Sequence, residues 1–390
     1  MLKAEHARFT MHFSQLKKEI IMIRTIIALL GVAMLFCFAT VSEAAWTILR
    51  EDNFVRDDGI DARLQDVYFM DNERGLVVGD NGLILVTTDG GKIWGKIEVD
   101  MRPPGAVQRP GGRPGGGGGP PGAGGPPAGM FGGGGGAPLY NIYFVDENVG
   151  YITGGRATIL KTEDGGKTWT RKMAMSDTPG RDGRPGRLRA NLMGIQMISE
   201  TTGFIAGSEN TILKTTDGGE TWVGSSERAR VGETRNNLEN IWFVSPTMGW
   251  VIGSFGTLLH TTDGGETWEK RNLASVDDNL FGIHFVDENM GWICGQGGLI
   301  LHTADGGATW NQQKTDSYDD LHDIIFVDAM VGWVVGGYNT ILHTTDGGKT
   351  WNKPPASVGG IDSFKGVHAT DSNNCWTVND GGVIAGYKAQ

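Results

Sequence analysis

Cysteine, positive charge and helical patterning are all scarce in this sequence. Only three of its 390 residues are cysteines. We expect Cys294 and Cys375 to be free, buried thiols, because they fall in repeats that are not neighbours. The 34 lysines and arginines are outnumbered by 45 aspartates and glutamates, so nucleic acid is disfavoured as a partner. No stretch after residue 44 has the apolar period of a helix, which excludes a helical solenoid.

A long apolar segment is also missing, except near the N-terminus. Thr25 to Thr40 is apolar, follows several cationic residues and precedes the small-residue site Ser42-Glu43-Ala44, which is the pattern of a signal peptide. This apolar run is too short, and too close to the cleavage site, to form a transmembrane helix of ordinary length. We therefore expect cleavage after Ala44 and export of a mature chain, residues 45–390, to the periplasm or the cell exterior. The cationic residues are Lys17, Lys18 and Arg24.

Three residues near this run refine the expected processing. A start at Met22 instead of Met1 would give the signal peptide an ordinary length. Cys37 follows the bulky Phe36, where a lipoprotein signal needs a small residue, so we do not expect a lipid anchor. Removing residues 1–44 takes away five basic and three acidic groups, which leaves 29 against 42 and a net charge of −13.

Glycine and tryptophan are abundant, and they mark a repeat. The chain contains 63 glycines and 12 tryptophans, as expected when a short, turn-rich unit recurs. A turn of the form Thr-x-Asp-Gly-Gly-x-Thr-Trp occurs six times, with Ile93 replacing the second Thr in the first copy. The copies are Thr87–Trp94, Thr162–Trp169, Thr215–Trp222, Thr261–Trp268, Thr303–Trp310 and Thr344–Trp351. The last three Trp-to-Trp steps are 46, 42 and 41 residues, a period typical of a four-stranded propeller blade.

Seven apolar strand starts show that there are seven units. They are Leu64, Leu139, Leu192, Leu238, Leu280, Leu321 and Phe364. The last unit stops before its fourth strand, whereas the mature chain begins with Trp46-Thr47-Ile48-Leu49, which resembles an unpaired fourth strand. Pairing the two ends would close the ring. We predict an all-β, seven-bladed β-propeller of four-stranded blades, closed by the N-terminal strand.

Three insertions interrupt the repeat at one kind of connection, from the fourth strand of a blade to the first strand of the next. They are the Gly/Pro-rich stretch Arg102–Pro138, the basic segment Met175–Ala190 and the polar segment Gly224–Asn237. We expect the first to be disordered. Because such connections emerge on one face of a propeller, we expect the insertions to surround one mouth of the channel and to form the binding face.

The aspartates of the repeated turn offer six carboxylates, but we expect a structural role for them. A short carboxylate in a turn accepts backbone N–H bonds locally, the glycines supply positive φ, and the Trp packs the turn on the blade. One such group per blade is too far from the next to share a substrate. The residues are Asp89, Asp164, Asp217, Asp263, Asp305 and Asp346, with Trp94, Trp169, Trp222, Trp268, Trp310 and Trp351.

No other set of residues indicates catalysis, a metal or a cofactor. His260, His302 and His343 occupy one place in successive blades, too far apart to converge on an ion. We find no group of nucleophile, base and oxyanion donor. We therefore expect neither an enzyme nor a bound cofactor.

Two rings of residues are expected on the innermost strands. The first ring, Asp66, Asn141, Gly194, Asn240, Gly282, Asp323 and Gly366, is small or polar. It is a candidate channel lining, in which Asp66 and Asp323 could meet a ligand. The second ring, Tyr68, Tyr143, Gln196, Trp242, His284, Ile325 and His368, is mostly large. We expect it to pack between blades.

The basic segment is the one dense positive region of an acidic chain. A solvated, flexible loop outside the blades is the plain interpretation. Its arginines could instead bind an acidic segment of a partner by forked hydrogen bonds. The candidate residues are Arg171, Arg181, Arg184, Arg187 and Arg189, with Lys172 adding to the patch.

The repeat resembles a known family. The turn is similar to the Asp-box, or BNR repeat, of sialidases, sortilin-type receptors and xyloglucan-cleaving glycosidases. The longer pattern, Leu280 to Asp287 through Gly291-Trp292 to Thr303 and Trp310, looks more like the photosystem II stability and assembly factors of cyanobacteria and chloroplasts. The resemblance covers about residues 46–390. It implies a propeller that binds a newly made reaction-centre protein through a basic patch.

The function expected from this resemblance is protein binding by an exported, monomeric scaffold, with a membrane protein during assembly as a possible partner. The alternative is a glycan-binding or glycoside-cleaving Asp-box propeller. A sialidase would need three arginines facing the channel, whereas the predicted first strands contain none except Arg63 at one edge. A glycosidase of the other kind needs two carboxylates across a cleft, usually between two propellers.

Overall fold

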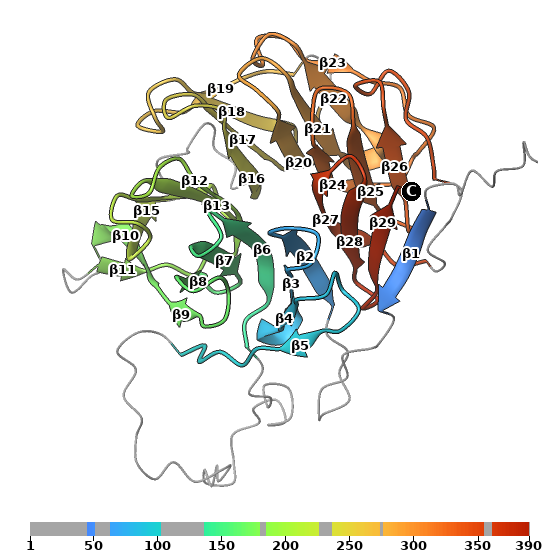
Figure 1. The fold of residues 1–390 in the computed structure, drawn as a ribbon. Helices are drawn as coiled ribbons and strands as arrows, with labels where there is room; N and C mark the ends of the chain where they lie inside the picture. Colours follow the sequence, from blue (N-terminus) through green and yellow to red (C-terminus); the bar gives the residue numbers. More distant parts are fainter. Residues whose placement is uncertain are drawn as a thin grey trace, which may run out of the picture. The chain divides into compact units, whose positions relative to one another are not determined.

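The computed structural model describes residues 45–50, 63–102, 136–179, 185–225, 236–273, 276–354 and 361–389. They form seven separate sheets arranged around a ring (Figure 1), so the predicted β-propeller is confirmed. Blades 1 to 7 begin at the predicted strand starts. These first strands are β2 (Leu64–Phe69), β6 (Leu139–Phe144), β12 (Leu192–Met197), β16 (Leu238–Phe243), β20 (Leu280–Phe285), β24 (Leu321–Phe326) and β27 (Phe364–Asp371).

The second strand of each blade lies buried between the first and third strands. In blades 1 to 6 it starts with a glycine: a Cβ on Gly75 would lie 2.6 Å from the ring of Phe69. The second strands are β3 (Gly75–Gly79), β7 (Gly150–Gly154), β13 (Gly203–Gly207), β17 (Gly249–Gly253), β21 (Gly291–Gly295), β25 (Gly332–Gly336) and β28 (Asn374–Asn379). The third strands are β4 (Ile84–Thr87), β8 (Thr158–Thr162), β14 (Thr211–Thr215), β18 (Thr257–Thr261), β22 (Ile300–Thr303), β26 (Ile341–Thr344) and β29 (Ile384–Lys388).

The fourth strands are short. They are β5 (Gly95–Lys96), β9 (Thr170–Arg171), β15 (Thr221–Ser225), β19 (Glu269–Lys270) and β23 (Asn311–Gln312). In blade 6 the expected fourth strand after Trp351 is only a bridge between His343 and Asn352. Pro354 follows two residues later, and a proline cannot donate to the ladder.

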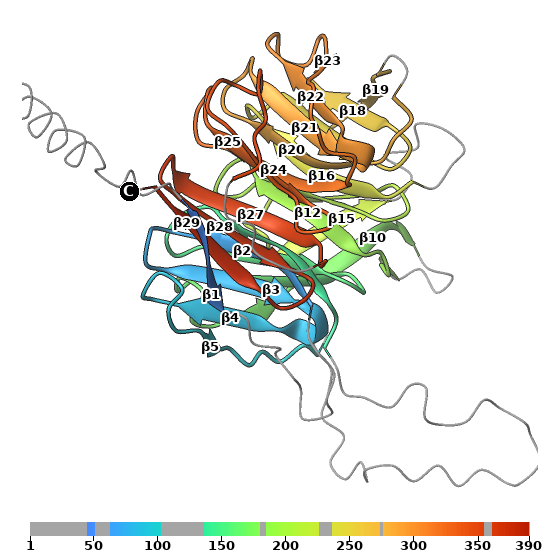
Figure 2. The same ribbon diagram turned by 90° about the vertical axis from the view of Figure 1, so that its right-hand side faces the viewer.

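The ring closes as predicted. Strand β1 (Ala45–Arg50) pairs antiparallel with β29, with Trp46 opposite Tyr387 and Ile48 opposite Ala385. Blade 7 therefore has the order β1-β29-β28-β27, and both views place blue β1 beside red β29 (Figures 1 and 2). Trp46 is 4% exposed, so the first described strand is also part of the core.

The basic segment Met175–Ala190 was expected to be a loop outside the blades, and for most of its described residues that expectation was wrong. Met173–Pro179 forms β10, which pairs in parallel with β15, and Pro185–Arg187 forms β11, which pairs with β10. Blade 3 is thereby extended to six strands in the order β11-β10-β15-β14-β13-β12. The outer edge of β15 would otherwise leave backbone groups unpaired.

The core is a series of apolar layers between neighbouring blades. One layer combines Phe204 and Ile212 of blade 3 with Leu238 and Phe243 of blade 4, and the rings of Phe204 and Phe243 stack with their centres 4.7 Å apart.

Cys294 and Cys375 are free and buried, as predicted. The only helices among the described residues are two three-residue 3-10 turns, η1 (Asp80–Gly82) and η2 (Gln296–Gly298). None of them is long and apolar enough to cross a membrane.

Candidate binding face and central channel

Each Asp-box turn is closed by its own side chains. In blade 4, Asp263 Oδ1 accepts hydrogen bonds from Thr261 Oγ1 at 2.8 Å and Thr267 N–H at 2.9 Å, and Oδ2 accepts from Thr267 Oγ1 at 2.6 Å. The hydroxyl and N–H of Thr267 lower the pKa of Asp263 to about 2. Gly264 and Gly265 have φ of 71° and 77°, a backbone conformation that favours glycine.

The two contacts to Oδ1 recur in the other copies, at Asp89, Asp164, Asp217, Asp305 and Asp346. The hydroxyl contact to Oδ2 recurs in all of these except Asp89, because Ile93 replaces the Thr in that copy. In each copy the Trp packs edge-on against an aromatic ring of its own blade or of the preceding one; Trp268, for example, lies 5.8 Å from Phe243. Each carboxylate is thus engaged by donors of its own turn. We propose that the six turns hold the blades together and do not act on a substrate.

The histidines of the third strands lie flat on tryptophans of the second strands. His260 stacks on Trp250 at 4.0 Å and His343 on Trp333 at 4.9 Å, while His302 lies 4.9 Å from Trp292. Each histidine therefore packs within its own blade. In the described ranges, no three or more His, Cys, Asp or Glu side chains are grouped to hold a metal ion.

The mouth of the channel is formed by a ring that the sequence reasoning missed. In each first strand the second residue faces a cavity of ≈ 170 Å³, together with Asp66, Asn141, Asn240 and Asp323 of the predicted first ring. These mouth residues are Gln65, Tyr140, Met193, Glu239, Phe281, His322 and Lys365. The ladder shifts register in the first strands, as between Leu64 and Asp66. Such a bulge brings consecutive side chains to one side.

Two aspartates of the first ring join neighbouring blades. Asp66 accepts hydrogen bonds from Val67 N–H at 2.8 Å in its own strand, and from Ile142 N–H at 2.9 Å and Asn141 Nδ2 at 3.0 Å in blade 2. Asp323 likewise accepts from Ile324 N–H and, across to blade 7, from Val367 N–H, both at 2.9 Å. These two candidate ligand groups are thus already engaged by the backbone.

Burial raises the pKa values of both carboxyl groups. For Asp66 burial is the main cause and the nearby Asp323 adds to it, and burial raises the pKa of Asp323 to about 7. The hydrogen bonds from backbone N–H groups act in the opposite direction but are outweighed. At neutral pH, ionisation of Asp323 therefore opposes folding.

Replacing Asp323 by Asn removes one of two acceptors, but its effect on the free energy of unfolding should be more favourable at pH 8 than at pH 5. A carboxyl group whose pKa is raised in the folded state destabilises that state as the pH rises from its ordinary value, 3.8, through about 7. Asn has no such cost, and Asn240 occupies the same ring position in blade 4. Urea unfolding measures the free energy of unfolding of both proteins at each pH. The buried histidines are present in both, so their own contribution to the pH dependence cancels in the difference. A difference that does not change with pH would contradict the raised pKa.

The second ring does more than pack between blades, which corrects the expectation. All seven of its members line a deeper cavity of ≈ 200 Å³ that shares Asp66 and Asp323 with the mouth cavity. Several also contact a neighbouring blade. The ring centres of Tyr68 and His368 are 4.3 Å apart, and Gln196 Nε2 donates a hydrogen bond to Phe243 O at 3.1 Å. The second ring faces the channel because residues two apart on a strand, such as Asp66 and Tyr68, lie on the same side of the sheet.

The mouth opens on the face that carries the insertions. Leu64, the first residue of β2, pairs with Gly79, the last residue of β3. The start of each first strand therefore lies at the same end of the blade as the turn between its second and third strands. The insertions lead into β6, β12 and β16. We call these turns and leading segments the insertion face; the residues 103–135 expected to be disordered lie outside the described part of the chain.

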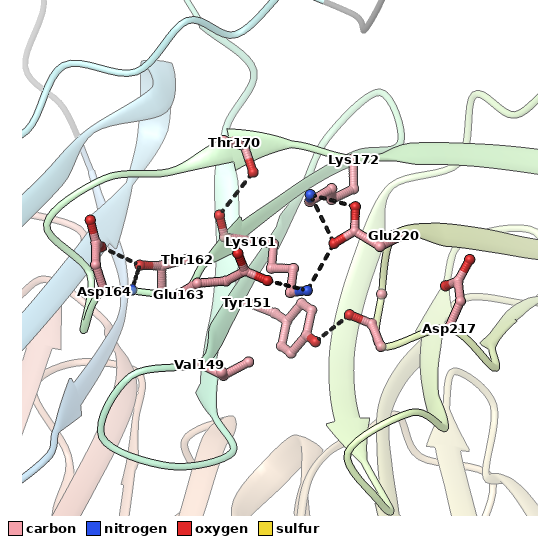
Figure 3. A network of polar contacts seen from close by, with 12 residues as sticks. Val149, Tyr151, Lys161, Thr162, Glu163, Asp164, Thr170, Lys172, Asp217 and Glu220 are labelled. Carbon is pink, nitrogen blue, oxygen red and sulfur yellow. Dashed lines mark hydrogen bonds and ion pairs between the residues drawn. The ribbon is translucent and has the colours of Figure 1, made fainter.

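Arg171 and Lys172 contribute little free charge to this face. The guanidinium of Arg171 donates to the backbone oxygens of Met101 and, at 3.5 Å, Arg156. Lys172 Nζ lies 2.8 Å from Glu220, which also binds the buried Lys161 at 2.8 Å (Figure 3). This network joins blades 2 and 3, so both cations have structural partners.

The remaining arginines fall on or beside the β10–β11 hairpin. Arg187 is the last residue of β11 and pairs with Met175 of β10. Arg189 is exposed in the segment that leads into β12. Arg181 and Arg184 lie outside the described residues. Of the described arginines, Arg187 thus lies in the outermost strand of blade 3 and Arg189 follows it.

The chain is similar to known proteins in sequence and in fold. The family described as "Photosynthesis system II assembly factor YCF48" matches residues 29–109, 227–317 and 309–384. The chain is 25% identical over 204 residues to the Photosystem II assembly lipoprotein Ycf48 of Synechococcus sp. (strain CC9902), which covers 51% of this chain and 47% of that protein. The chain thus matches about half the length of this curated relative.

Solved structures share the fold. YCF48 from Cyanidioschyzon merolae superposes with a TM-score of 0.62 at 18% identity, covering 88% of this chain and 99% of that one. A structure of YCF48 bound to D1 peptide gives 0.61 at 18%, covering 89% and 100%. A GH74 xyloglucanase from Xanthomonas campestris gives 0.59 at 11%, covering 89% and 54%. At these identities the likeness concerns the fold alone.

Proposed function

Because the chain belongs to the photosynthesis system II assembly factor YCF48 family, we propose that it is an exported, non-enzymatic scaffold that binds a protein partner on its insertion face. The observation that carries this proposal is the basic hairpin on an acidic propeller: β10 runs parallel to β15 toward the insertion face, and the basic residues Arg187 and Arg189 lie in β11 and just after it. A relative of the same fold was solved with a D1 peptide. We propose a partner of the same kind, a membrane protein segment met during assembly.

The geometry supports binding by charge. Guanidinium groups form paired hydrogen bonds with carboxylates, and charges at a rim act mainly on the association rate and on specificity. The hairpin is fixed to blade 3 through the β10–β15 pairing. The backbone of Arg187 is therefore fixed in a sheet, which lowers the entropic cost of binding.

Replacing Arg181, Arg184, Arg187 and Arg189 together by Ser should weaken binding of an acidic partner peptide more than tenfold. The melting temperature should stay unchanged, since the substitutions leave the backbone pairing of β10 intact. Fluorescence anisotropy with a labelled D1 peptide and with a Glu-rich peptide measures this effect. Binding by the parent should also weaken with salt, because exposed charges are screened over about 10 Å at 0.1 M.

A matched control removes cations from the opposite face. Lys92, Lys167 and Lys349 are exposed in Asp-box turns, at the other end of the blades from the insertion face. Their replacement by Ser should leave the affinity unchanged. Equal loss of affinity in both variants would reduce the effect to net charge, and equal affinity of parent and Arg variant would remove the hairpin from the site.

Export and the absence of catalysis belong to the same proposal. The signal-peptide pattern of residues 1–44 supports export, and the Synechococcus relative is named a lipoprotein. The engagement of the Asp-box carboxylates by their own turns supports a role other than catalysis. Reproducible hydrolysis of sialosides or β-glucans by the purified chain, abolished by an inner-strand carboxylate substitution, would favour the glycosidase alternative.

A further inference from the structure

Four large apolar side chains stand in solvent on the insertion face of blades 4 to 7. Phe255 is 71% exposed, Tyr318 92%, Tyr338 74% and Ile361 82%. Phe255 and Tyr338 are at the tips of the turns between second and third strands, whereas Tyr318 and Ile361 lie in segments that lead into β24 and β27. We call these four residues the aromatic arc. Apolar groups gathered on one face of a soluble protein indicate an interaction site.

The arc is continuous, because hydrogen bonds join its turns from one blade to the next. Phe255 N–H donates to Asn279 Oδ1, whose amide in turn donates to Gln296. The neighbouring Gly297 N–H donates to Asp320, two residues after Tyr318. Gly337 N–H donates to Asp320 O and Asn339 N–H to Asp362 O, which connects Tyr338 to Ile361. The turns and segments that carry the four side chains are therefore joined into one stretch of the insertion face.

The fold does not need aromatic residues at the two turn tips. Phe255 and Tyr338 have φ of 56° and 50°, a left-handed conformation that is unfavourable for bulky residues. The same turn position holds Asn81 and Gly297, with φ of 63° and 65°, and these residue types suit it best. Blades 2 and 3 carry Arg156 and Glu209 there, with φ of 57° and 59°, so the turn forms without an aromatic ring. An exposed aromatic residue in an unfavourable backbone conformation indicates a role in binding rather than in folding.

Acidic residues predominate around the arc, although Lys365 of the channel mouth lies 3.8 Å from one of them, Asp380. The turns and leading segments of blades 4 to 7 comprise residues 254–256, 276–279, 296–299, 315–320, 337–340, 361–363 and 380–383. They contain seven aspartates and no lysine or arginine. The basic hairpin lies on blade 3, so the insertion face is divided into a basic sector and an acidic, aromatic sector.

We propose that the aromatic arc docks a partner segment that combines cationic and apolar side chains. Lysine and arginine are attracted to the faces of Tyr and Phe rings and to the surrounding carboxylates, and the apolar side chains of the segment would cover Ile361 and the ring edges. Aromatic residues at the centre of an interface commonly provide most of its affinity. This surface is distinct from the basic hairpin, which selects acidic groups.

Short labelled peptides test the inference on the mature chain. A peptide of Lys, Leu and Gly should bind at least tenfold more tightly than one of Glu, Leu and Gly or one of Lys, Ser and Gly. The triple variant Phe255→Asn, Tyr318→Ser and Tyr338→Asn should lose about tenfold or more of that affinity. Its melting temperature should not fall, because Asn suits the left-handed turn positions better.

Two controls make the outcome decisive. Ile93→Ser removes an apolar side chain that is 73% exposed on an Asp-box turn of the opposite face, and it should leave the affinity unchanged. The arginine-to-serine variant of the hairpin should also bind the Lys, Leu and Gly peptide at least as well as the parent. Equal binding of all three peptides, or of parent and triple variant, would overturn the proposal. Self-association of the parent that the triple variant abolishes would assign the arc to a second copy of the chain instead.

Discussion

Removal of β1, residues 45–50, should lower the free energy of unfolding by more than 3 kcal/mol. Trp46 alone, if replaced by Ala, should cost about 3–5 kcal/mol, because its ring is buried against Tyr387, with ring centres 5.7 Å apart. Deletion of the whole strand also exposes the β29 edge and removes a ladder of backbone hydrogen bonds. Denaturant unfolding of the purified chains measures both effects.

A control within the same strand separates burial from chain length. Ile48 is 42% exposed, so Ile48→Ala should cost far less than Trp46→Ala. A truncated chain that unfolds at the same denaturant concentration as the parent would show that β1 does not close the ring.

Replacing Asp66 by Ala should destabilise the protein by about 2–4 kcal/mol, the second largest effect expected here. The substitution leaves the N–H groups of Val67 and Ile142 and the amide of Asn141 without their acceptor at the contact between blades 1 and 2. Asp66→Asn is the matched variant, since it keeps one acceptor oxygen and carries no charge.

The comparison of these two variants tests the role assigned to this residue. Asp66→Asn should lie between the parent and Asp66→Ala in thermal unfolding. If Asp66→Ala melts like the parent, the carboxyl group does not join the blades, and a role in ligand binding would again be open for it.

The sequence predicted the blade architecture because its signals are local. The turn of Asp263 is closed by residues two before and four after it, and each first strand begins at an apolar residue of fixed spacing from that turn. Ring closure also followed from local counting, since a missing strand at one end matched a spare strand at the other. Such features need no knowledge of distant contacts.

The parts that were missed depend on neighbours in space. Strand β10 exists because the edge of β15 in the next blade is free, and nothing in Met173–Pro179 alone indicates parallel pairing. The mouth ring escaped notice because Gln65, Tyr140 and Met193 share a position but no chemistry. The repeated register shift near Asp66 is what turns them to the channel, and no residue type marks it in the sequence.

The aromatic arc could have been anticipated in part. Phe255 and Tyr338 stand where the other blades carry Asn, Gly or a charged residue, so an alignment of the repeats against each other shows them as the two aromatic residues at this turn position. Their exposure and the hydrogen bonds that connect their turns could only come from the fold, because the segments involved belong to different blades.

The central claim, that this propeller is a protein-binding scaffold of its family, is tested most directly by cross-linked capture from the native cell envelope. The tagged mature chain would be the bait, and the arginine-to-serine variant its control. We expect the parent to enrich a membrane protein, added salt to release that protein, and the variant to recover little of it. Recovery of glycans, or of the same proteins by parent and variant at every salt concentration, would contradict the claim.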